Sequence, residues 1–65
     1  MRNIKLKKAR EKMGLTQVEV ARKAKISPLS YQRYEYGERI PNASTAILIA
    51  KAVNSSVEAL FTEIK

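Results

Sequence analysis

The sequence predicts an all-α protein in which five short helices form one compact domain over residues 1–65. Three observations lead to this fold class. Residues that cap helix starts precede several segments, at Thr16, Ser27 and Asn42. Gly14 and Gly37 stand where helices should end, and apolar residues recur at helical spacing between these markers. The expected helices cover about residues 3–13, 17–24, 28–36, 43–53 and 56–62.

The first helix should pack one narrow side against the core. Leu6, Ala9 and Met13 follow the i, i+3, i+7 pattern of a buried stripe, and lysines occupy the outer side. Gly14 suits the left-handed conformation that ends a helix. A helix lying on a membrane surface is the alternative for a basic amphipathic segment, but here the stripe is narrow and lacks aromatic residues.

The second helix begins with a complete capping pattern. The Thr16 hydroxyl can accept a hydrogen bond from a free N–H of the first turn, and Glu19 stands at the capping-box position three residues later. Leu15 and Val20 have the spacing of a hydrophobic staple, in which residues on either side of the cap pack together. The helix start is therefore well defined.

The third helix repeats this pattern, with Ser27 as the cap and Pro28 at the first helical position. Tyr31 and Tyr34 are three residues apart and share one side of the helix. The other side mixes apolar and hydrogen-bonding groups, as a surface that reads DNA bases requires. An ordinary solvated helix face is the alternative from spacing alone. This side consists of Pro28, Leu29, Gln32, Arg33 and Tyr36.

The last two helices are mainly apolar. Asn42 caps the fourth helix, and Asn54 can adopt the left-handed turn that stops it. Ser55 or Ser56 starts the final helix, and Ser55 with Glu58 fits a capping box. The expected buried residues are Ala46, Ile49, Ala50 and Val53 in the fourth helix and Val57, Leu60 and Phe61 in the last.

The composition excludes several kinds of site. The chain has no Cys, His, Asp or Trp, which removes thiolate and imidazole metal ligands and the commonest general base. We therefore expect no enzyme, no metal and no cofactor. The lack of Cys also gives no sign of a disulfide framework, which fits the expected cytoplasmic location. No apolar run is long enough for a signal peptide or a membrane span, so we expect a protein that does not enter membranes.

The positive charge is confined to the part of the chain that contains the second and third helices. Residues 1–39 hold eleven Lys and Arg and four Glu, a net charge of +7, whereas residues 40–65 are neutral overall. A one-sided basic surface points to a polyanion partner, most often nucleic acid. A merely solubilising surface is the alternative.

The sequence resembles the phage Cro and repressor type helix-turn-helix family, also called the XRE family. The pattern T-Q-x-E-x-A at 16–21 and the ending E-x-G at 35–37 are similar to that family's signature. The resemblance extends from about Leu6 to Leu60. Residues at the family's spacings are Gln17, Ala21, Ile26, Ser27, Tyr31, Tyr34, Glu35, Gly37 and Pro41.

The resemblance implies that the third helix enters the major groove of double-stranded DNA. It also implies an ion pair between Arg10 and Glu35 that sets the angle of this helix. The alternative for each lysine is a solvated charge. The residues expected to contact bases are Ser27, Pro28, Leu29, Gln32 and Arg33. Those expected to contact phosphates are Thr16, Gln17, Lys25, Tyr36 and Arg39.

Three positions depart from the family pattern. Lys25 stands where the family favours Gly in the turn, so the turn could be strained or differently shaped. Pro28 and Leu29 replace residues that are often polar, which suggests fewer direct hydrogen bonds to bases. Ser55 replaces a usually apolar residue and weakens the junction with the last helix.

Together these features predict a sequence-specific DNA-binding transcriptional regulator, and more narrowly a repressor of a phage or other mobile element. An antitoxin or a restriction-system controller of the same fold is an alternative. From a different class, the chain could be a protein–protein adaptor that has lost DNA binding.

We also expect a weak homodimer through the neutral C-terminal part, from Asn54 to Phe61. The residues expected at this contact are Asn54, Ser55, Ser56, Val57 and Phe61. Alternatively, Val57, Leu60 and Phe61 merely complete the monomer core, as we expect Leu60 to do.

Overall fold

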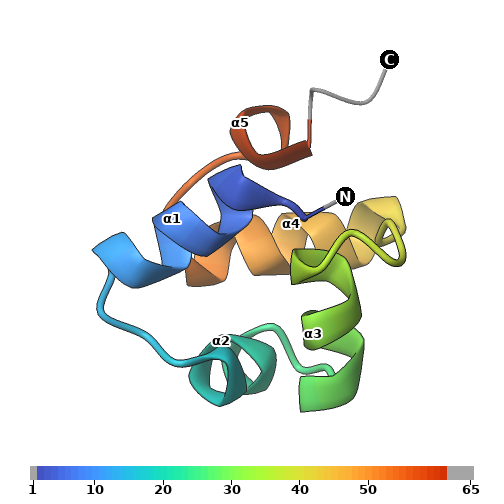
Figure 1. The fold of residues 1–65 in the computed structure, drawn as a ribbon, viewed down its shortest axis with the longest axis horizontal. Coiled ribbons are helices and arrows are strands. Elements are labelled where there is room, and N and C mark those ends of the chain that lie inside the picture. The colour runs from blue at the N-terminus through green and yellow to red at the C-terminus, as the bar shows by residue number, and fades with distance from the viewer. Residues whose placement is uncertain (1, 62–65) are drawn as a thin grey trace.

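A computed structural model describes residues 2–61 and confirms the all-α fold with five helices. Within these residues no strand is present. The helices are α1 (Ile4–Lys12), α2 (Gln17–Lys23), α3 (Pro28–Glu35), α4 (Ala43–Ala52) and α5 (Val57–Phe61), as shown in Figure 1.

The observed helices are slightly shorter than the expected ranges because the latter included cap residues. The residue that follows each of the first four helices is its C-cap, and Asn3 is the N-cap of α1. Cap residues are only half helical, so they lie outside the helix proper. The expected last position of the final helix, residue 62, lies outside the described residues.

Side-chain caps define the helix starts. Thr16 and Glu19 form both bonds of the capping box, at 3.1 and 2.8 Å. Asn42 accepts the Thr45 N–H at 2.9 Å, as predicted. The expected capping box of Ser55 is not formed, because Ser56 accepts the Ala59 N–H instead and caps α5.

The first four helices end in one recurring motif. In each, the residue after the C-cap has a positive φ, and two backbone bonds close the last turn, as in a Schellman motif. Gly14, Gly37 and Asn54 occupy this position as predicted, with φ of 72°, 78° and 56°. Lys25 also adopts it, with φ 61°, so the turn between α2 and α3 keeps the shape that glycine would allow.

One apolar core joins all five helices. Each of the four residues predicted to be buried in α4 is buried, as is Leu60 of α5. The prediction for Met13 was wrong, because this residue caps α1 at its end and is 45% exposed. The largest fully buried side chains are Tyr31, Leu6, Ile49, Leu60 and Val20.

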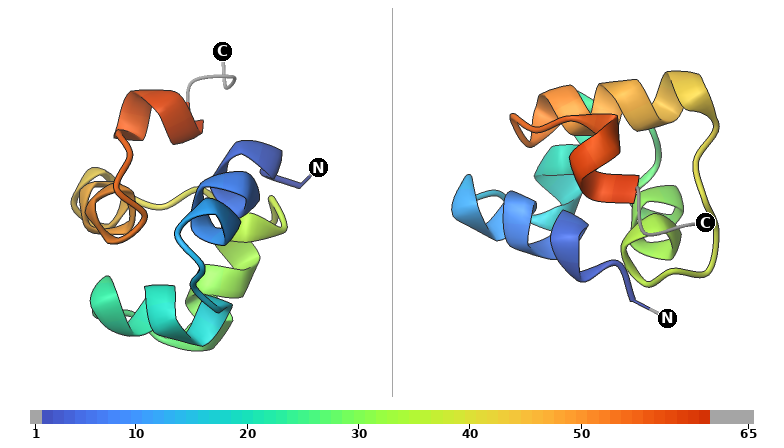
Figure 2. Two further views of the ribbon diagram at one scale, coloured as in Figure 1. Left: turned by 90° about the vertical axis from the view of Figure 1, so that its left-hand side faces the viewer. Right: turned by 90° about the horizontal axis from the view of Figure 1, so that it is seen from above.

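The helices are arranged in three levels. α2 and α3 lie at one end of the molecule, α5 lies at the other end, and α1 and α4 lie between them (Figures 1 and 2). α4 packs against α2, and α5 packs against both α1 and α4. This packing leaves one side of α3 uncovered at the surface.

Candidate nucleic-acid interface

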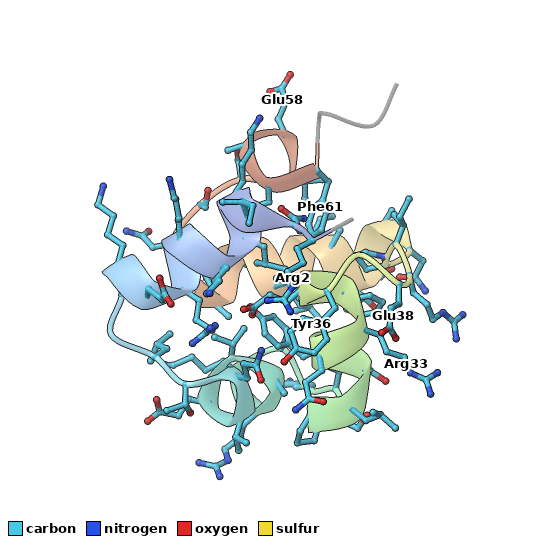
Figure 3. The ribbon with its side chains drawn as sticks, viewed as in Figure 1. Arg2, Arg33, Tyr36, Glu38, Glu58 and Phe61 are labelled. Atoms are coloured by element: carbon cyan, nitrogen blue, oxygen red, sulfur yellow. The ribbon has the colours of Figure 1, made fainter. Side chains whose placement is uncertain are left out.

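α3 has one buried side and one exposed side. Tyr31 and Glu35 are buried, and Tyr34 is half-buried against the core. Leu29 is 58% exposed although it is apolar, and Arg33 projects away from the body of the molecule (Figure 3). The five residues predicted to contact bases therefore lie on α3 or its cap: Ser27, Pro28, Leu29 and Arg33 are exposed, and Gln32 is half-buried.

The start of α3 is built by Ser27 and Pro28. The Ser27 hydroxyl oxygen accepts the Ser30 N–H at 3.1 Å, and the hydroxyl donates to the Ser30 hydroxyl oxygen at 3.0 Å. Because these bonds use the Ser27 proton and one lone pair, one lone pair remains for an outside donor. Ser27 is thus first of all a structural cap.

An ion pair between α1 and α3 holds α3 in place. The Arg10 guanidinium donates from Nε to Glu35 Oε1 at 3.0 Å and from Nη2 to Glu35 Oε2 at 2.9 Å. Its Nη1 donates to the Leu15 carbonyl at 2.9 Å, which ties in the turn before α2. The side chains are only 13% and 3% exposed. A fork of this kind, shielded from water, fixes both distance and angle between two helices.

The surroundings of Glu35 keep its carboxylate charged. Burial would raise the pKa of Glu35, but the hydrogen bond from Arg10, assisted by the nearby Tyr31 hydroxyl, lowers that pKa below its ordinary value. Burial, and then the nearby Glu35 carboxylate, raise the pKa of Tyr31 above its ordinary value. The Tyr31 hydroxyl is buried without a well-aligned hydrogen bond, so its main contribution is to packing.

The N-terminus of α2 lies beside this ion pair. Because Thr16 caps the Glu19 N–H, the N–H groups of Gln17 and Val18 have no partner within the helix. The Gln17 side chain is half-buried and close enough to Glu35 to help lower the pKa of that carboxyl. Gln17 is therefore oriented by the protein itself. The Thr16 N–H is bound to the Glu19 carboxylate, which leaves only the Thr16 hydroxyl for an outside contact.

The three remaining residues expected at phosphates are all exposed. Lys25 lies in the turn between α2 and α3, and Tyr36 is the C-cap of α3. Arg39 follows α3 in the loop, where its backbone N–H donates to the Arg33 carbonyl at 3.3 Å. Lys25 therefore lies before the N-terminal end of α3, and Tyr36 and Arg39 lie after its C-terminal end.

Two residues before α1 were not among the predicted site residues. Asn3 is buried and caps α1 by accepting the Leu6 N–H at 3.0 Å. Arg2 lies with its guanidinium carbon 5.2 Å from the centre of the Tyr36 ring (Figure 3). Asn is among the best N-cap residues, so its place before an apolar-patterned segment was an available signal for Asn3. The contact of Arg2 had no such local signal.

Other kinds of site find no support in the part of the chain that the structure describes. No group of three or more acidic residues there is placed to bind a metal ion. None of the helices between residues 2 and 61 has the length and apolar character needed to cross a membrane.

Two helices are joined by a short turn, and the second is held by an ion pair and exposed along a side that mixes apolar and hydrogen-bonding groups. This arrangement defines a helix-turn-helix DNA-binding domain. The chain belongs to the helix-turn-helix family of the XRE type, whose family model matches residues 6–60. It is thus a DNA-binding regulator of this type. Comparisons with curated proteins and with solved structures found no match.

Proposed function

We propose that this protein is a sequence-specific repressor that reads the major groove of double-stranded DNA with α3. The observation that carries the proposal is the exposed side of α3, where Leu29 and Arg33 face outward while Glu35 anchors the opposite side. A reading helix must be both exposed and rigidly oriented, since base edges are recognised by geometry. Both conditions are met.

The exposed side chains suit different base edges. The fork of Arg33 can donate to both acceptors of a guanine, and Leu29 can pack on thymine methyl groups. Gln32 is half-buried and can pair with adenine from the same side. Ser27 and Pro28 then lie at the entering end of the helix. Because Ser27 is largely used in capping, Arg33 is the main source of base discrimination.

Phosphate contacts are proposed for residues around α3. The open N–H groups at the start of α2 suit a phosphate beside Thr16 and Gln17, because a helix N-terminus favours anions. Lys25, Tyr36 and Arg39 would contact the backbone at the ends of α3. Such contacts add affinity without choosing a sequence.

A repressor can act simply by occupying its operator, and the described residues present one surface suited to DNA. An antitoxin or a restriction-system controller uses the same chemistry and remains an alternative. Such a regulator works where the DNA is, which supports the expected cytoplasmic location.

We further propose that two copies bind a pseudo-palindromic site, because one short helix covers few base pairs. The neutral C-terminal part supplies the contact. Asn54, Ser55 and Ser56 are exposed there, whereas Val57 and Phe61 are half-buried against the core and offer only part of their surface. This small contact area supports a weak dimer that DNA stabilises by holding both copies together.

One observation favours the adaptor alternative. Ile40 and Ile47 are apolar, belong to the neutral part of the chain, and are 64% and 47% exposed. Exposed apolar residues can contribute to a protein-binding surface.

Selection of bound duplexes from a random library tests the proposal. The expected result is a preferred site with two related halves about 10 base pairs apart. If about six phosphates are neutralised, log affinity should fall against log salt with a slope of roughly −5. An adaptor would yield no preferred duplex and a shallow slope.

A further inference from the structure

The segment before α1 is anchored at two points. The Asn3 N–H donates to the Glu35 carbonyl at 2.9 Å, and its side-chain Nδ2 donates to the Leu60 carbonyl at 3.0 Å. Because Asn3 is buried and bound on both sides, the next residue toward the N-terminus emerges at a defined place. That residue is Arg2, beside the end of α3.

Arg2 is oriented by the ring of Tyr36. Its guanidinium carbon lies 5.2 Å from the ring centre, and Figure 3 shows the two side chains together at the surface. The Tyr36 backbone is held at the end of α3, because its N–H donates to the Gln32 carbonyl at 2.9 Å. Stacking covers one face of the guanidinium and leaves the N–H donors in its plane available.

The stacked pair borders a hollow of about 220 Å³ whose surroundings are positively charged. Arg10 and Glu35 neutralise one another, so the charges of Arg2 and Lys7 remain. No other acidic residue lines the hollow among those described. It is bordered by Arg2, Asn3, Ile4, Lys7, Gln17 and Tyr36 together with the Arg10–Glu35 pair. Two unneutralised cations in a polar hollow favour a compact anion such as phosphate.

We propose that Arg2, together with Lys7, binds a DNA backbone phosphate at this hollow, and that Tyr36 positions Arg2 for the contact. The inference rests on the proposed function and extends it. Ser27 and Pro28 lie at the N-terminal end of α3, whereas this contact lies at its C-terminal end. A phosphate held there fixes the tilt of α3 in the groove from the end opposite its entry.

Arg2→Gln measures the contact. One phosphate contact releases about 0.9 counterion, which corresponds to roughly tenfold in affinity at about 0.1 M salt. Because each bound copy loses one contact, the variant should bind the selected duplex and an unrelated duplex about tenfold more weakly per bound copy, with the salt slope reduced by about 1 for each copy. Lys51→Gln is the control, because it removes one positive charge from α4 in the neutral part of the chain. It should leave affinity and slope unchanged.

The role of Tyr36 is tested by a double-mutant cycle. Tyr36→Leu removes the ring and should weaken binding nearly as much as Arg2→Gln, and the double variant should lose little more. Tyr36→Phe keeps the ring and should bind within about twofold of the wild type if positioning is the main role. Independent losses from Arg2→Gln and Tyr36→Leu would contradict positioning by stacking.

The outcomes separate this inference from the proposed function. If the wild type binds duplexes and Arg2→Gln has the same affinity and slope, the inference is wrong and the proposed function stands. If the wild type binds no duplex, both are wrong. In that case, a shift of the Arg2 Nε–H signal in an NMR titration with inorganic phosphate would identify a small-anion site instead. A lowered melting temperature for Arg2→Gln would assign Arg2 to the fold and also overturn the inference.

Discussion

The part of the molecule formed by α1 to α3 and the part formed by α4 and α5 are held in place by different interactions. In the first part, the orientation of α3 depends on charged and polar bonds, chiefly between Arg10 and Glu35. In the second part, α4 buries only apolar side chains, among them Ile49 and Ala50. Eleven of the thirteen Lys and Arg residues lie in residues 1–39, which contain α1 to α3 and part of the loop that follows.

This difference means that the interactions that orient α3 are not the ones that supply most of the stability of the fold. Charge-assisted bonds are directional and set the angle of α3, whereas apolar burial is non-directional and supplies most of the free energy of folding. Asn3 connects the two parts, because it binds the carbonyls of Glu35 and Leu60. Substitutions should therefore affect mainly stability in α4 and α5, and mainly DNA recognition at the exposed residues around α3.

The largest effect is expected in α4. Ile49→Ala removes a fully buried side chain and should lower the free energy of unfolding by about 2–5 kcal/mol. A chain of this length has only several kcal/mol of stability, so much of the protein would unfold. Urea denaturation measures the loss. Ile47→Ala is the control on the exposed side of the same helix, and should cost less than about 1 kcal/mol. Equal losses would contradict the observed packing of α4.

The second largest loss of stability is expected when the ion pair between Arg10 and Glu35 is broken. Arg10→Ala or Glu35→Gln leaves a shielded charge without its partner and should lower the free energy of unfolding by up to about 3 kcal/mol. The Glu35 contribution also depends on pH. Because its pKa is lower in the folded state, this stabilisation is present above the unfolded pKa, about 4.3, and is lost as pH falls through the folded pKa.

Thermal melts between pH 7 and pH 2.5 check this dependence. The difference between the wild type and Glu35→Gln should be largest at neutral pH and should narrow in acid. Glu38→Gln is the control, because Glu38 is exposed in the loop after α3 and takes no part in the buried pair. A constant difference across this pH range would show that the charge of Glu35 does not matter.

A smaller effect is expected for Arg33, on the affinity for DNA and not on the stability of the fold. Arg33→Ala should weaken the preferred duplex by about 1–3 kcal/mol and relax the choice at one base pair, because a forked contact to guanine is lost. Lys25→Ala and Arg39→Ala should instead weaken all duplexes alike, since phosphates carry no sequence information. Fluorescence anisotropy with the selected duplex and its single-base variants measures both patterns. Uniform losses for all three variants would make Arg33 a phosphate contact.

The smallest effect concerns the turn between α2 and α3. Lys25 has φ 61°, a conformation that is costly for a residue with a side chain, so Lys25→Gly should relieve strain. The added flexibility of the unfolded chain offsets part of the gain, which leaves up to about 1 kcal/mol of added stability. Calorimetry would detect a higher melting temperature. DNA affinity should fall at the same time on every duplex, and a rise in affinity would contradict a phosphate role for Lys25.

Much of the fold could be predicted because helix limits depend on neighbours in the chain. The bonds of Thr16, Ser27 and Asn42 span only three residues, and the left-handed positions follow the C-caps of the first four helices. Apolar spacing then identified the buried side of α4. The exposed side of α3, with Leu29 and Arg33, was predictable for the same reason, since its periodicity lies within one helix.

The amino-acid sequence by itself determined where the helices begin and end and which side of α3 faces outward. The contacts that orient and surround α3 were decided only by tertiary structure. Met13 follows the apolar spacing of α1 but lies beyond its packed length, and Asn3 reaches a carbonyl 57 residues away. The ion pair joins residues that are 25 positions apart in the sequence. The contact between Arg2 and Tyr36 joins the segment before α1 to the residue that follows α3. Such partners meet only once the helices have packed, because their distances depend on all the turns between them.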